Sequence, residues 1–115
     1  MDQPGNTSTS NIVVPIVCRP DYRIGLEVIE GGALFIHADV YGKTTKHLLT
    51  RFRADIDTIM GLVNQPVFAM TYSTDPKTVA KLTKFAAKMG FTPHGVFDCL
   101  DGNPRLVHLR WDKAS

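Results

Sequence analysis

The fold is decided by the stretch DPKTVAKLTKFAAKMGF, residues 75–91. Asp75 is placed to cap a helix that begins at Pro76, where the missing N–H of proline costs nothing. Gly90 stands where a left-handed C-terminal cap is expected. Apolar side chains at three-to-four spacing form one inner face, made of Val79, Leu82, Phe85, Ala86 and Met89. The stretch therefore predicts an amphipathic helix with both ends defined.

A buried strand and another helix are predicted before this segment. Pro66 to Ser73 is a short, mostly apolar run, which is typical of a strand buried on both faces. From Thr45 the three-to-four spacing of apolar residues predicts a helix long enough to join parallel neighbouring strands. Its apolar positions are Leu48 or Leu49, Phe52, Ile56, Ile59 or Met60, and Val63, and they leave outside Arg51, Arg53, Asp55 and Asp57.

Two hairpins and an edge strand complete the predicted sheet. The hairpin strands are Tyr22 to Glu30 with Ala33 to Tyr41, and His94 to Leu100 with Arg105 to Trp111. Gly31-Gly32 and Asp101-Gly102-Asn103 supply the turns. Ile12 to Val17 is β-branched and contains Pro15, whose missing N–H favours an edge position or a bulge.

This order predicts an α/β (α+β) fold, in which a mixed sheet of about six strands is flanked by two main helices. Residues 12–115 have the length of a single domain. Residues 1–11 are small and polar, and they cannot bury enough apolar surface to offset their ordering entropy. We expect these residues to form a flexible tail.

Charge and hydropathy argue against several classes of function. The chain of 115 residues has a formal net charge of +2, too small for the concentrated basic surface of nucleic-acid-binding proteins. No apolar run approaches the roughly 20 residues that span a bilayer, and no signal-peptide pattern opens the sequence. The histidines and cysteines lack zinc spacing. We therefore expect a cytoplasmic protein with no membrane contact and no metal site.

The order of elements resembles the fold of GNAT-type N-acetyltransferases over roughly Tyr22 to Trp111. The most specific part of the resemblance is the helix of residues 75–91 with its closing Gly90-Phe91, followed by Thr92-Pro93-His94-Gly95. In that family the pantetheine arm of acetyl-CoA lies between two splayed strands, which correspond here to Ala33 to Tyr41 and Pro66 to Ser73. The resemblance therefore implies acetyl-CoA as the cofactor.

The resemblance places the cofactor's pyrophosphate on the loop from Tyr41 to Lys46. Unpaired amides at a helix start, with the positive end of the helix dipole and nearby lysines, do form an anion site. The residues expected to bind cofactor are Val40, Tyr41, Gly42, Lys43, Thr44, Thr45, Lys46 and, through the adenosine 3′-phosphate, Lys77. The alternative is a Thr-capped helix start with solvated lysines, and a solvated stripe made of Lys77, Lys81, Lys84 and Lys88.

Candidate catalytic groups lie on the two strands of the expected gap. The two-residue period of Ala33 to Tyr41 places His37 and Asp39 on one face, where either can serve as the base that deprotonates an amine. Tyr72 can supply a hydroxyl to the leaving thiolate. The alternatives are a polar solvent-facing edge for His37 and Asp39, and a packing role for Tyr72.

Two hypotheses follow. The first is an acetyl-CoA-dependent N-acetyltransferase that acts on an amine acceptor. The second is a GNAT-like binding or structural module with a protein partner, because the loop keeps the single Gly42, the segment before Phe85 to Lys88 offers no tyrosine, and no helices precede the first hairpin. The short form resembles compact chains of tailed phages, which implies host cytoplasm or virion, and a homo-oligomer can supply the missing wall. A gap filled by Phe35, Tyr41 or Phe68 would argue against cofactor binding.

Overall fold

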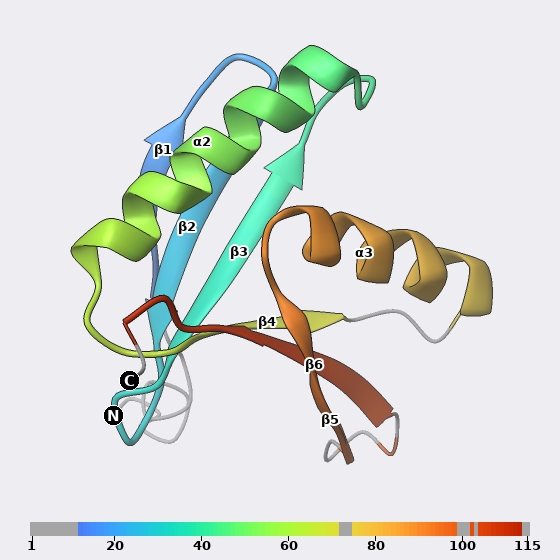
Figure 1. The fold of residues 1–115 in the computed structure, drawn as a ribbon. Helices are drawn as coiled ribbons and strands as arrows, with labels where there is room; N and C mark the ends of the chain where they lie inside the picture. Colours follow the sequence, from blue (N-terminus) through green and yellow to red (C-terminus); the bar gives the residue numbers. More distant parts are fainter. Residues whose placement is uncertain (1–11, 72–74, 99–101, 103, 114–115) are drawn as a thin grey trace, which may run out of the picture.

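The computed structural model describes residues 12–71, 75–98, 102 and 104–113, which form one mixed six-stranded sheet and two helices (Figure 1). The elements are β1 (Val13–Cys18), β2 (Tyr22–Val28), β3 (Leu34–Val40), α2 (Lys46–Leu62), β4 (Val67–Thr71), α3 (Pro76–Lys88), β5 (Thr92–Asp98) and β6 (Pro104–Arg110). The predicted α+β class is thereby confirmed. Residues 1–11, predicted as a flexible tail, lie outside the described residues.

The strands are arranged in the order β1-β2-β3-β4-β6-β5. Four neighbouring pairs are antiparallel, and β3 with β4 is parallel. The parallel pair is joined by α2, because a chain that returns to run in the same direction needs a long crossover. β1 is an edge strand with a register shift between Pro15 and Val17, as the internal proline predicts.

Helix α2 forms where its sequence pattern predicts. The Thr45 hydroxyl accepts a hydrogen bond from the backbone N–H of Leu48 at 3.1 Å and caps the helix start. Its buried side chains are Leu48, Phe52, Ile56, Ile59 and Met60. They form the main core with Tyr22 and Ile24 of β2, and Figure 1 shows α2 lying over β1 and β2, roughly along the strands.

Both predicted ends of α3 are observed. Asp75 accepts hydrogen bonds from the N–H and the hydroxyl of Thr78 at 3.1 and 2.7 Å. Gly90 adopts φ +87°, and the N–H of Phe91 donates to the Ala86 carbonyl while Gly90 N–H donates to Ala87. This pair of bonds is a Schellman motif, which satisfies carbonyls at the helix end.

The inner face of α3 is less buried than its apolar spacing predicts. No side chain of the helix is fully buried, and Leu82 remains 40% exposed. The reason is that this face of α3 borders a groove instead of closing onto the sheet. None of the described helices is both long and apolar enough to cross a membrane.

Candidate functional site

The parallel strands β3 and β4 separate soon after they begin. Leu34 pairs with Val67 and Phe35 with Phe68, whereas β3 continues to Val40 and β4 to Thr71 without further pairing between them. Figure 1 shows the two strands diverging toward their carboxyl ends. Among the described residues, the β4-facing edge of β3 beyond Phe35 therefore has no strand partner, and its backbone groups remain available to another molecule.

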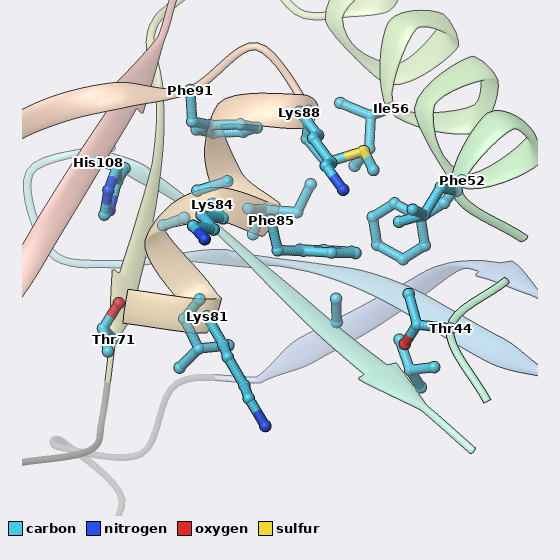
Figure 2. A pocket seen from close by; sticks show the side chains of 18 of the residues that line it. Thr44, Phe52, Ile56, Thr71, Lys81, Lys84, Phe85, Lys88, Phe91 and His108 are labelled. Atoms are coloured by element: carbon cyan, nitrogen blue, oxygen red, sulfur yellow. The ribbon is translucent and has the colours of Figure 1, made fainter. Parts of the chain in front are cut away.

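A groove of about 620 Å³ lies on the helix-covered face of this divergence (Figure 2). Its floor is apolar and comes from alternate residues of β3, namely Ile36, Ala38 and Val40. One wall comes from α2 and the other from α3. The apolar wall residues include Leu49, Phe52, Ile56, Leu82, Phe85 and Ala86. A mostly apolar concave site with a few polar groups is the usual form of a small-molecule site.

The groove is open at its mouth, and Phe35, Tyr41 and Phe68, the aromatic side chains whose presence in it would argue against cofactor binding, do not line it. Phe35 and Phe68 stack with ring centroids 5.6 Å apart at the last paired position of the two strands, and neither lines the groove. Tyr41, just beyond β3, is 57% exposed.

The start of α2 stands at this mouth. Val40 and Thr44 line the groove. Tyr41, Gly42, Lys43 and Thr45 belong to the exposed connection between β3 and α2, and Lys46 is the exposed first residue of α2. The Thr45 cap satisfies the N–H of Leu48. The earlier amides of Lys46 and His47 lie outside the helical hydrogen-bond pattern, as at any helix start.

A row of lysines on α3 borders the groove. Lys81, Lys84 and Lys88 are exposed and line it, whereas Lys77, at the helix start, is exposed but not among the lining residues. The sequence spacing predicts one helix face for the four, and three of them line the groove together. The spacing does not reveal that this helix face borders a groove, because the placement of α3 relative to α2 and the sheet is set by tertiary packing.

The inner end of the groove carries two buried polar residues that sequence reasoning did not single out. Thr71 ends β4 and is 6% exposed, and His108 on β6 is 2% exposed. The Nε2 atom of His108 has no hydrogen-bond partner among the described residues. Burial lowers the pKa of His108 below its usual value. The available sequence signal was a histidine between the apolar Val107 and Leu109 of a predicted strand.

The candidate bases lie on the opposite face of the sheet from the groove. His37 Nε2 is 2.6 Å from Glu27 Oε1, and the Arg23 guanidinium donates to Asp39 Oδ2 at 3.1 Å. Both side chains border a smaller hollow of about 130 Å³. Tyr72, the third candidate, lies outside the described residues.

Comparison of the chain with protein-family models, with curated proteins and with solved structures gave no match. In the part of the chain that the structure describes, no group of three or more His, Cys, Asp or Glu side chains is arranged to hold a metal ion. The candidate site is therefore defined by its own geometry: a divergent strand pair, an apolar groove, a helix start at the mouth and a buried histidine at the inner end.

Proposed function

We propose that the chain binds acetyl-CoA in this groove and is an N-acetyltransferase-like protein. The observation that carries the proposal is the divergence of β3 from β4 beside the groove, with the start of α2 at its mouth. The resemblance of the element order to GNAT-type N-acetyltransferases supports the same assignment.

The phosphates of the cofactor are assigned to the mouth of the groove. The amides of Lys46 and His47 and the positive end of the α2 dipole attract an anion, and Lys43 adds a cation beside them. Lys81, Lys84 and Lys88 give one wall of the groove a positive charge. Because coenzyme A is strongly anionic, these charges favour its approach.

The pantetheine arm is assigned to the groove itself. Its methylene and methyl groups match the apolar floor formed by Ile36, Ala38 and Val40. Its amide groups need hydrogen-bond partners, and the unpaired edge of β3 can offer backbone N–H and C=O groups. An extended ligand can thus occupy the place of the missing strand contacts.

In the proposed transfer the acceptor amine approaches from the open face of the sheet and reaches the thioester through the gap between the diverging strands β3 and β4. His37 or Asp39 removes a proton from the amine, the amine nitrogen forms a bond to the thioester carbon, and the carbon–sulfur bond breaks. The leaving thiolate takes a proton, for which Tyr72 is the proposed donor. These roles follow the family resemblance and the placement of His37 and Asp39 on that face.

A second candidate function is acyl-CoA binding without transfer, as part of a protein assembly. It is favoured by the contacts of the two candidate bases, because His37 is held by Glu27 and Asp39 by Arg23. A base already engaged in such contacts must exchange them for the substrate. The absence of a hydroxyl on Phe85, which lines the groove, favours the same alternative.

Binding is tested by the thermal midpoint of the purified protein with acetyl-CoA, free coenzyme A and ADP. A ligand specific for the folded state adds about 2.7 kcal/mol of stability at a hundredfold excess over its Kd. A clear midpoint increase with acetyl-CoA is expected. No increase at millimolar ligand would refute the proposal.

A groove-filling variant makes the test specific. Ala38→Leu adds volume to the groove floor and should abolish the increase in midpoint. Ala80→Leu is the matched control, because Ala80 is exposed on α3 and does not line the groove. Thiol release in the presence of candidate amines then separates transfer from binding alone.

A further inference from the structure

His108 is a buried polar side chain that the fold itself does not satisfy. It is 2% exposed, lines the inner end of the groove, and has no hydrogen-bond partner for Nε2 among the described residues. Buried polar atoms in folded proteins nearly always have a partner, since an unpaired one loses the hydrogen bonds that it makes to water. When such an unpaired polar atom belongs to a residue that lines a cavity, its hydrogen-bond partner is expected to be a ligand that enters the cavity.

The neighbours of His108 explain why the fold supplies no partner. In the sheet His108 lies opposite Ala69 of β4 and opposite Pro93 of β5. Neither side chain carries a hydrogen-bonding group, and proline also lacks a backbone N–H. Figure 2 places Phe91, Thr71 and Lys84 near His108 at this end of the groove. Phe91 is apolar, and neither the Thr71 hydroxyl nor the Lys84 ammonium is hydrogen-bonded to Nε2.

The position of His108 relative to the mouth decides which part of a ligand it would meet. Figure 2 shows Thr44 at one end of the groove and Thr71 and His108 at the other, with Phe85 between them. A coenzyme A thioester with its phosphates at the start of α2 would therefore extend its acyl end toward His108. The polar atom at the acyl end of the ligand is the thioester carbonyl oxygen.

We propose that His108 Nε2–H donates a hydrogen bond to the thioester carbonyl oxygen, so that the groove selects acylated over free coenzyme A. This inference rests on the proposed function and names its specificity residue. A neutral imidazole supplies the required N–H in one tautomer, and a carbonyl oxygen is a better acceptor than the sulfur of a free thiol.

The test compares acetyl-CoA with S-ethyl-CoA, a thioether of nearly the same shape without the carbonyl. Isothermal titration of both ligands is carried out on the wild type, His108→Leu, His108→Gln and His108→Asn. The wild type should prefer acetyl-CoA by about fivefold to tenfold, the size of one hydrogen bond. His108→Leu should bind both ligands equally.

The two amide variants separate a hydrogen bond from mere polarity. The amide nitrogen of Gln reaches about as far as Nε2, so His108→Gln should keep the preference for acetyl-CoA. The amide of Asn ends near the position of Nδ1, and His108→Asn should lose it. Because these two variants are both polar, they decide the question even if His108→Leu does not fold.

The outcomes distinguish this inference from the proposed function. If the wild type binds neither ligand, the proposed function fails and the inference fails with it. If the wild type binds both ligands equally, or if His108→Leu and His108→Asn keep the preference, the role of His108 is refuted while acyl-CoA binding stands.

Discussion

Phe52 of α2 and Phe85 of α3 lie edge to face, with ring centroids 5.1 Å apart and ring planes inclined at 68°. Both rings line the groove, and Figure 2 shows them side by side. Phe52 belongs to the main core, where it also contacts Tyr22, whereas α3 has no fully buried side chain. The aromatic pair is therefore an important apolar link between α3 and the rest of the domain.

Phe85→Ala should detach α3 from this core. We expect the free energy of unfolding to fall by about 2 to 3 kcal/mol, since a half-buried phenylalanine costs somewhat less than a fully buried one. Leu82→Ala, at a 40% exposed site on the same helix, should cost less than about 1 kcal/mol. Urea unfolding measures both. In a double-mutant cycle with Phe52→Ala, a coupling of about 0.5 to 1.5 kcal/mol is expected, and additive effects would contradict a direct link.

Gly90→Ala should destabilise the end of α3 for two separable reasons. Gly90 has φ +87°, a conformation that L side chains rarely adopt, and an added Cβ would lie 3.1 Å from the Arg110 guanidinium. Arg110 in turn donates to the Met89 carbonyl and to Asp57.

The matched control is Gly31→Ala, because Gly31 has φ +91° with no atom near the position of a Cβ. Gly31→Ala should cost about 1 kcal/mol from backbone strain alone, and Gly90→Ala about 1 kcal/mol more. Equal losses in thermal and urea unfolding would show that Arg110 moves aside freely.

Asp55→Asn should remove part of the acid sensitivity of the fold. The Arg19 guanidinium donates to both carboxylate oxygens of Asp55, at 2.6 and 2.7 Å, and Tyr22 donates its hydroxyl. The hydrogen bonds from Arg19 lower the pKa of Asp55 in the folded state. The unfolded carboxyl therefore takes up a proton first, and the stability that Asp55 contributes is full above its usual pKa and is lost as pH falls through the folded pKa.

We expect Asp55→Asn to lower stability by about 1 to 2 kcal/mol at neutral pH and to flatten the decline of stability below about pH 4. Asp39→Asn is the comparison, since the Asp39 side chain is 60% exposed in its contact with Arg23 and exposed pairs contribute little. An unchanged acid decline in Asp55→Asn, measured by urea unfolding across pH, would contradict this role.

The elements of the fold were predictable from local signals. The caps Thr45 and Asp75, the glycines at positions 31, 32 and 90, and Pro15 in the edge strand act within a few residues of their own position. The apolar spacing of α2 identified its buried face. These signals do not depend on how distant segments meet.

The candidate site and some of the ion pairs depend on contacts between distant segments, which the spacing of residues in the sequence does not encode. Asp55 was expected on the outer side of its helix, yet Arg19 and Tyr22 reach it from more than thirty residues away in the sequence. The lysines of α3 border a groove because side chains do not fill the space between α2, α3 and β3. The buried environment of His108 arises from Ala69 and Pro93 on the two neighbouring strands, and a single sequence does not give that register.

The same residue gives a final prediction, on stability and pH. Burial lowers the pKa of His108 in the folded state, so between that lowered value and the usual value of about 6.5 the unfolded chain binds more protons than the folded chain. The stability from a neutral His108 is therefore full above about pH 6.5 and is lost as pH falls below it.

His108→Leu removes this titration, and it also removes an unpaired buried nitrogen, so its unfolding free energy should be unchanged or higher at pH 7. Between about pH 5 and 6.5, above the range where the carboxylates titrate, the wild type should lose more stability on acidification than His108→Leu. Urea unfolding at half-unit pH steps measures the difference, and parallel profiles for the two proteins would mean that the folded protein protonates His108 as readily as water-exposed imidazole.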